Sequence, residues 1–279
     1  MAAILGADLF LHVRTGAVEY AELLRSADVD LESGGDAADA SSRADAAWAT
    51  TLAAMRDWKI TAKGIWVPDD LGLLQIIASM FGVAPSIVPL PLDLKLWYAS
   101  AKDLTGTGFV SALGIQAPYN EAVKFDCAIQ GSAALTPATD AFPVRGAVGA
   151  LVPMLGSSCV VKLGGSAVTF WKDCSVKIAR AAADASNRSS AGWKVQLGAM
   201  RSWEIDIPGL YLGDAGNAAM ITAYLARSPT TFEIELQTGY KLGGTFIPQN
   251  LKNGQPLGGA ATLDLTGKGA GALAWTVPA

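Results

Sequence analysis

The residue types that perform most protein chemistry are scarce in this chain. His12 is the single histidine, so a His-dependent catalytic triad or a multi-His metal site lacks its essential side chains. The three cysteines, Cys127, Cys159 and Cys174, are odd in number and show no Cys-x-x-Cys spacing, which indicates small buried residues and neither a disulfide framework nor a zinc site. The run 267–271 (GKGAG) lacks a Lys-Ser/Thr ending and is predicted to be a turn, not a phosphate-binding loop. We therefore expect no catalytic residue, no metal ligand and no cofactor.

Low charge is the main feature of the composition. Of the 279 residues, 51% are hydrophobic and only 16% are charged, and the net charge is −4. A protein that grips DNA through its phosphates needs clustered Lys and Arg, which this balance does not supply. So much apolar surface is expected to be covered at subunit interfaces. The apolar stretch 71–92 imitates a membrane span, but Gly82, Pro85, Pro89 and Pro91 interrupt it, so we expect no membrane span.

The chain repeats itself at a constant offset of 145 in the numbering. Of the 33 residue pairs formed by segments 37–69 and 182–214, 16 are identical. The identical pairs include Asp39/Asp184, Arg43/Arg188, Trp48/Trp193, Arg56/Arg201, Trp58/Trp203 and Asp69/Asp214. Such self-similarity indicates a tandem duplication. We predict a first unit over residues 1–138, a linker over 139–153 and a second unit over 154–279.

Each unit is predicted to contain several strands and one helix. Alternating polar and apolar residues indicate strands at 26–32 and 55–61, repeated at 172–178 and 200–207. The segments before Trp48 and Trp193 are rich in Ala, Ser, Asp and Arg and are interpreted as long loops or arms that leave each unit.

Helical spacing of apolar residues predicts helices at 71–81 and 215–226. Asp69-Asp70 and Asp214 are the N-cap candidates, because a short acidic side chain accepts hydrogen bonds from the first helical N–H groups. After the helices the equivalence between units is predicted to run at an offset of 136, which pairs Gly108 with Gly244.

The order arm, Trp, short strand with Trp, Gly-Leu-Tyr-x-x-Asp and helix resembles the major tail proteins that form the tail tube of long-tailed, non-contractile phages. In the second unit the likeness is carried by Trp193, Trp203, the Gly209-Leu210-Tyr211 turn with Asp214, and the closing TLDLTGKGAGAL at 262–273. In the first unit Trp66 stands in place of the tyrosine, and Gly131-Ser132-Ala133 stands in place of the glycine pair.

The resemblance implies a mainly β fold with short helices (α+β), in which two tandem β-sandwich or open-barrel units are each flanked by one α-helix. It also implies that the sheets join edge to edge around a ring with a central channel for DNA. Six units per ring are usual in this family, so a doubled chain implies three chains per ring. The implied place is the virion tail, assembled in the bacterial host cytoplasm. The implied partners are further copies of the chain and the tape-measure, terminator and distal tail proteins, with DNA only in transient passage.

Three sets of residues are candidate assembly sites. The arm residues occupy the position of the family's loop that reaches an adjacent ring, with a solvated loop as the alternative; they are Asp39, Ser41, Arg43, Asp184, Ser186 and Arg188. Asp28, Asp30 and Glu32 share one face of a predicted strand and either line the channel or form an ordinary solvated face. The aromatic residues predicted for the core or the interfaces are Trp48, Trp58, Trp193, Trp203 and Tyr211.

Two other classes of function stay open. A two-domain β-sandwich binding or adhesion module would hold a carbohydrate or surface ligand on exposed Trp97, Trp171 or Trp275. An enzyme is disfavoured, because the sequence shows no cluster of acid–base side chains.

Overall fold

The computed structural model describes residues 10–14, 20–23, 26–39, 51–67, 70–81, 91–99, 102–139, 153–169, 171–187, 190, 194–236 and 239–277. The elements of the first half are β1 (Phe10–Arg14), β2 (Tyr20–Glu22), β3 (Ser26–Asp39), β4 (Thr51–Ile65), α1 (Leu71–Phe81), β5 (Leu92–Ala99), β6 (Lys102–Pro118), β7 (Lys124–Gly131) and β8 (Thr136–Ala138). After the short 3-10 helix η2 (Gly156–Ser158), the second half contains β9 (Val160–Leu163), β10 (Ser166–Ala167), β11 (Asp173–Asp184), β12 (Gln196–Leu210), α2 (Ala215–Ala226), β13 (Thr230–Glu235), β14 (Lys241–Gly254) and β15 (Thr262–Thr276).

The two halves share one topology. In the described residues, each half has four strands, a helix and three strands in that order, with β8 as an addition to the first half. The first half pairs its strands in the order β2-β1-β5-β6-β7-β4-β3, and the second pairs them as β10-β9-β13-β14-β15-β12-β11, always antiparallel. The predicted fold class, mainly β with two short helices, is confirmed. The predicted unit boundaries stay a prediction, and most of the predicted linker lies outside the described residues.

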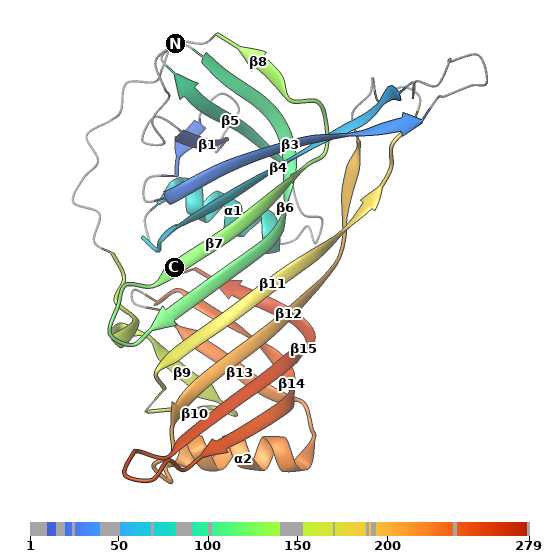
Figure 1. Cartoon of the computed structure of the whole chain (residues 1–279). Coiled ribbons are helices and arrows are strands. Elements are labelled where there is room, and N and C mark those ends of the chain that lie inside the picture. Colours follow the sequence, from blue (N-terminus) through green and yellow to red (C-terminus); the bar gives the residue numbers. More distant parts are fainter. Residues whose placement is uncertain are drawn as a thin grey trace.

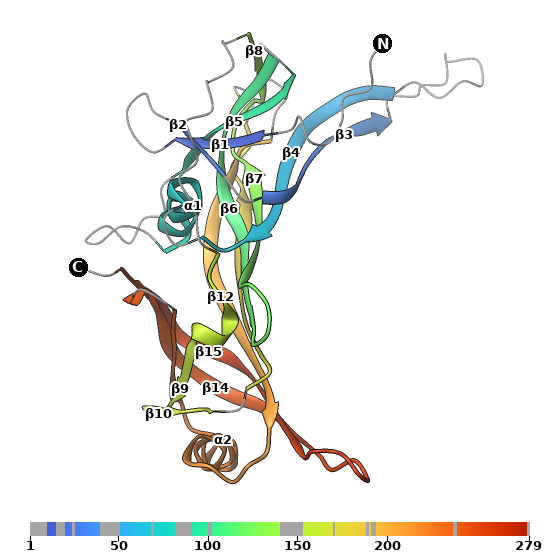
Figure 2. The same cartoon turned by 90° about the vertical axis from the view of Figure 1, so that its left-hand side faces the viewer.

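Eight strands form one continuous sheet in the order β3-β4-β7-β6-β11-β12-β15-β14, seen as the diagonal stack in Figure 1. The first half of β6 also pairs with β5, and the first half of β14 pairs with β13, so each of these long strands belongs to the long sheet and to a smaller one. Both helices and the strands β1, β2, β9 and β10 lie on the same side of the long sheet (Figure 2). This side of the long sheet holds the core.

The strand register corrects the predicted equivalence of the last three strands. Trp58 Nε1 donates to the carbonyl of Ala133 at 2.8 Å, and Trp203 Nε1 donates to the carbonyl of Gly271 at 2.9 Å. The numbers of the two tryptophans differ by 145 and those of the two acceptors by 138, so the predicted offset of 136 is wrong. Several glycines in this region allow several alignments by residue type, and only the register selects one of them.

The same register confirms the offset of 145 along the arms. A β-bulge lies between Gly35 and Ala37 in the β3–β4 pair, and its counterpart lies between Arg180 and Ala182 in the β11–β12 pair. The bases of the arms differ from the predicted loops, because they are strands, whereas residues 185–187 of the second arm have no regular secondary structure. β3 runs on to Asp39 and β11 to Asp184, so the base of each arm is a strand hairpin that continues the long sheet.

The helices begin and end at the predicted residues. Asp70 Oδ1 accepts from the N–H of Leu73 at 3.1 Å, and Asp214 Oδ1 accepts from the N–H of Asn217 at 2.7 Å. Asp214 is therefore the counterpart of Asp70, and not of Asp69, which lies outside the described residues. Within the described part of the chain, neither helix has the length and apolarity that a membrane crossing requires.

Two predictions about chemically suggestive residues have clear outcomes. The run 267–271 lies inside β15, so the predicted turn is wrong; cross-strand pairing includes Gly267, Lys268 and Gly269. All three cysteines are free and buried, as predicted. Burial raises the pKa of the Cys127 thiol to about 12, which removes the thiolate needed for reaction at neutral pH. His12 is also buried, with its ring 6.3 Å from that of Trp97 in an edge contact.

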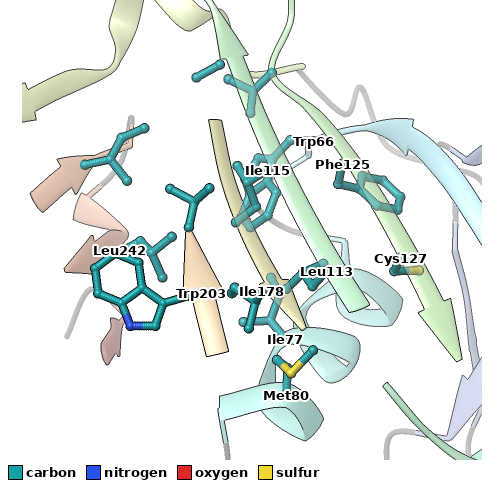
Figure 3. Close-up of a cluster of buried hydrophobic side chains, with 14 of the residues drawn as sticks. Trp66, Ile77, Met80, Leu113, Ile115, Phe125, Cys127, Ile178, Trp203 and Leu242 are labelled. Carbon is teal, nitrogen blue, oxygen red and sulfur yellow. The ribbon is translucent and has the colours of Figure 1, made fainter. Parts of the chain in front are cut away.

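The halves are joined by strand pairing. Residues 173–179 of β11 pair with residues 112–118 of β6, so seven consecutive pairs close the sheet between the halves. Figure 3 shows Ile178 and Trp203 of the second half beside Ile77, Met80 and Leu113 of the first. We define these seven pairs as the internal junction.

Side chains on the core side reinforce the internal junction. The ring of Trp275 lies 5.6 Å from that of Trp66 and stacks on Phe81 at 6.4 Å. Arg201 Nη1 donates to the carbonyl of Met80 at 2.6 Å, in the last turn of α1. A cation is favourable there because the last carbonyls of a helix lack intrahelical partners and carry partial negative charge.

A first prediction concerns the glycine beside Trp203. A Cβ on Gly269 would overlap the Trp203 indole, whereas a Cβ on Gly271, two positions along the same strand, meets nothing within 4 Å. Gly269→Ala should lower the free energy of unfolding by ~1–3 kcal/mol through overpacking. Gly271→Ala should be neutral or slightly stabilising, because it lowers only the entropy of the unfolded chain. Urea denaturation measures both, and equal values would contradict the packing argument.

A second prediction separates two arginines that occupy equivalent positions. Arg201→Ala removes the hydrogen bond to Met80 and should lower the free energy of unfolding of the single chain by ~1–2 kcal/mol. Arg56→Ala, at the equivalent position of the first half, changes an exposed side chain and should stay within ~0.5 kcal/mol. Thermal unfolding below the concentration of self-association tests this, and a larger loss for Arg56→Ala would refute it.

Candidate assembly surfaces

The long sheet ends in two open edges. Among the described residues β3 pairs only with β4, and residues 247–254 of β14 pair only with β15. An open edge presents unpaired N–H and C=O groups that attract another strand. β3 is the counterpart of β11, and β14 is the counterpart of β6. The two strands with open edges are therefore equivalent to the two strands that pair with each other at the internal junction.

The second half also exposes apolar residues at positions that the first half covers. Trp66 is 0% exposed and its counterpart Tyr211 is 38% exposed. With the helices aligned on Asp70 and Asp214, Phe81 corresponds to Leu225, which is 73% exposed. In the first half the cover over Trp66 and Phe81 is Trp275 from the second half. Tyr211 and Leu225 together therefore mark a surface suited to contact with another chain.

The arms of the two halves lie side by side and project in the same direction (Figure 1). The backbone N–H of Lys194 donates to the carbonyl of Arg56 at 2.7 Å, and Lys194 Nζ lies 3.2 Å from Asp57 Oδ2. The predicted arm residues Ser41, Arg43 and Arg188 lie outside the described residues, and of Asp39 only the backbone is described.

Hydrogen bonds of Asp184 and Ser186 connect the residues at the end of β11 in the second arm. Asp184 is exposed, and its Oδ1 accepts from the backbone N–H of Ser186 at 2.8 Å. Hydrogen bonds from the Ser186 side chain and backbone lower the pKa of Asp184, so this carboxylate stays charged at the base of the arm tip. Ser186 also accepts from the N–H of Val195 at 2.9 Å, which ties the two strands of the arm together. The inter-ring role of these residues stays a prediction.

The predicted acidic set lies on the side of the long sheet that faces away from the core. Asp28, Asp30 and Glu32 are exposed on one face of β3, with Lys63 opposite Asp28 and Lys59 opposite Glu32. We call this side the polar face. Its charges alternate from strand to strand: Lys177 on β11 lies opposite Glu204 on β12, and Glu204 lies opposite Lys268 on β15, with 3.5 Å between Lys268 Nζ and Glu204 Oε1.

Acidic side chains gather at one part of the polar face. Partial loss of water raises the pKa of Asp173, and Glu121 adds to this effect against the opposing charge of Lys124. Loss of water also raises the pKa of Asp206, with a further contribution from Asp264 and Asp173. Both pKa shifts favour the neutral carboxyl, so ionisation of these two side chains is less favourable than in water, and a nearby cation would favour it.

The predicted aromatic residues divide into three groups. Trp58 and Trp203 are buried, as a core role requires, whereas Tyr211 is exposed and belongs to the surface. Trp48 and Trp193 lie outside the described residues. The binding-module alternative needs exposed Trp97, Trp171 or Trp275, but Trp97 is 2% and Trp171 is 6% exposed, and Trp275 is stacked among Trp66, Phe81 and Tyr240. That expectation is wrong for Trp97 and Trp171, which lie in the core, whereas Trp275 is partly buried at the internal junction.

Sequence reasoning missed the residues that join the halves. The contacts of Trp275 and Arg201 exist only because β11 pairs with the part of β6 that β5 leaves unpaired. No local sequence pattern contains that information. The only signal was the Arg56/Arg201 identity, which marks a repeated position without naming its partner.

Comparison with known proteins supports the resemblance. The family model described as "Phage tail tube protein" matches residues 165–274, from β10 into β15. No curated protein matches the chain. Two solved structures are similar over 44% of this chain and 98% of theirs, each with a TM-score of 0.40: the tail of an empty GTA particle refined with C6 symmetry, at 22% identity, and the virion of a native gene transfer agent particle, at 20%.

The family match covers most of the second half, which has the strand pairing described above. Residues 165–274 therefore match the phage tail tube protein family, the family that the sequence resembles.

Proposed function

We propose that this chain is the major subunit of a phage tail tube, and that three chains close into a ring of six units around a channel for DNA. The observation that carries the proposal is the long sheet with one open edge at each end, where each edge is the counterpart of a strand already paired at the internal junction. A head-to-tail contact between β3 and β14 is heterologous, and repetition of one heterologous contact closes into a ring when the rotation allows it.

Each chain would contribute two of the six units of the ring, one from each half. We take them as tandem copies of one tube unit, over residues 1–138 and 154–279 with a linker over 139–153. Three chains would then contribute three times the eight strands of the long sheet to one closed sheet, which leaves no edge open.

The polar face suits the lumen of this ring. The helices and small sheets cover the other side of the long sheet, so the polar face is the side without a core (Figure 2). Asp28, Asp30 and Glu32 would contribute negative charge that keeps passing DNA from adhering, with the neighbouring lysines limiting the repulsion. The arms would reach the adjacent ring through Asp39, Ser41, Arg43, Asp184, Ser186 and Arg188.

The proposed role is structural and non-enzymatic, with no cofactor. The partners are other copies of the chain in stacked rings and the tape-measure, terminator and distal tail proteins, in the virion tail after assembly in the host cytoplasm. This rests on the family match at residues 165–274 and on the open edges.

A third prediction follows for the purified chain. At increasing concentration it should form rings or tubes with three chains per ring, visible by negative-stain electron microscopy and countable by native mass spectrometry. Rings of six chains would refute the pseudo-hexamer and leave the tube in place. A monomer that never assembles at high concentration would refute the proposed function.

A further inference from the structure

We infer that the contact between chains repeats the internal junction residue for residue, so that β3 of one chain pairs antiparallel with residues 250–254 of β14 in a second copy, with Glu32 opposite Lys252. This inference rests on the proposed ring and names the residues that close it.

The register follows from two equivalences within the chain, the first of which relates β3 and β4 to β11 and β12. Glu32 lies opposite Lys59 in the β3–β4 pair, and Lys177 lies opposite Glu204 in the β11–β12 pair. The opposed residues, Lys59 and Glu204, are separated by the same offset that relates Trp58 to Trp203. The β3–β4 and β11–β12 strand pairs also share the bulge described above. Glu32 therefore corresponds to Lys177.

The second equivalence relates the later strands at the offset that links Ala133 to Gly271. Because Lys59 lies opposite Gln130 and Glu204 lies opposite Lys268, β7 corresponds to β15 with Gln130 matched to Lys268. The β5–β6 and β13–β14 pairs have matching registers, so β14 corresponds to β6 at the offset that links Ala133 to Gly271. Under it Gly106, beside Trp58, corresponds to Gly244, beside Trp203.

These two equivalences carry the internal junction onto the open edges. Lys177 lies opposite Gly114 within the chain. Lys177 corresponds to Glu32 and Gly114 corresponds to Lys252, so the repeated contact sets a carboxylate opposite an ammonium group. By the same step Asp30 lies opposite Gly254 and Gly34 lies opposite Asn250. Every pair stays on the matching face, since Leu31 and Leu251 belong to the core side.

Charge complementarity supports this register independently. Lys252 and Glu32 are both exposed on the polar face. Within each chain Lys252 lies opposite Asp264, and Glu32 lies opposite Lys59. The contact would therefore complete a row of alternating sign, Asp264, Lys252, Glu32 and Lys59, like the row of Lys177, Glu204 and Lys268 beside the internal junction. A shift by one position would turn every side chain to the wrong face of the sheet.

The helix C-terminus beside the open edge supplies a second contact. With the helices aligned on their N-caps, and with Gly72 and Gly216 both close to the backbone of the small sheet, Met80 corresponds to Tyr224. Arg201 donates to the carbonyl of Met80 within the chain. Its counterpart Arg56 is exposed, and in the repeated contact it would reach the Tyr224 carbonyl of the next copy. Tyr211 and Leu225, exposed in the single chain, lie on the same part of the second half and would be covered there.

The decisive experiment is disulfide trapping in assembled rings. In Glu32→Cys/Lys252→Cys, mild oxidation should link neighbouring chains and give a covalent trimer on a non-reducing denaturing gel, because directly opposed residues in an antiparallel pair have Cα atoms about 4.5–5.5 Å apart, within disulfide range. In the control Asp28→Cys/Lys252→Cys, the partner is four positions away, about 13 Å along the strand, and no link should form. The native cysteines are buried and do not interfere.

Charge exchange provides a second readout without cysteine. Glu32→Lys and Lys252→Glu should each raise the concentration for half-assembly by about tenfold or more, since like charges then lie directly opposite across the contact. The double variant Glu32→Lys/Lys252→Glu restores opposite charges across the contact and should recover part of the loss, with Lys59 and Asp264 then facing like charges within each chain, whereas Asp28→Lys with Lys252→Glu should not recover. Arg56→Ala should also raise the half-assembly concentration, and circular dichroism of each variant should be unchanged.

The outcomes separate the two claims. If the wild type forms no ring, the proposed function fails. If rings form but the Asp28→Cys pair links and the Glu32→Cys pair does not, the tube stands and the inferred register is overturned. A linked trimer together with rescue by charge exchange supports both, and a linked hexamer supports the register but not the count of three chains.

Discussion

The pairing of β11 with the second half of β6 is the interaction on which the rest of this structure depends. β6 is long enough to carry β5 on the first part of one edge and β11 on the second part, so one strand serves both the small sheet of its own half and the long sheet shared by the two halves. Without that pairing each half would have its own open edges and an uncovered helix. With it, Trp275 covers Trp66 and Phe81, and Arg201 reaches the end of α1.

The internal junction within the chain serves as a template for the proposed contact between chains. Equivalent strands β3 and β11 differ in one respect, since β11 has a partner on both edges and, among the described residues, β3 has one. The same holds for the second halves of β6 and β14. The apolar exposure of Tyr211 and Leu225 follows the same asymmetry. Edge pairing and side-chain burial thus mark the same two places at which the proposed neighbour would bind.

The junction between copies would be less apolar than the internal one. The internal junction sets Ile178 beside Leu113 and Val176 beside Ile115, all buried. The corresponding positions between copies are Ser33 with Leu251 and Leu31 with Asn253. A contact that relies more on backbone pairing and on charge is reversible at low concentration and screened by salt.

The sequence alone indicated a repeat at an offset of 145 and predicted both helices with their N-caps, the buried cysteines and the tail tube resemblance, because these depend on local periodicity and on residue identity at a fixed spacing. The tertiary structure decided the rest. It alone showed that the bases of the arms are strands, that Gly244 corresponds to Gly106 and not to Gly108, and that Trp97 and Trp171 are buried while Trp275 is partly buried. The physical reason is that strand register and edge pairing are long-range: glycine-rich strands fit several alignments by residue type, and only the packing of Trp58 and Trp203 against particular glycines selects one. Arg56 and Arg201 illustrate the limit, since both are exposed residues at equivalent positions, yet Arg201 has the end of α1 within hydrogen-bond reach and donates to it.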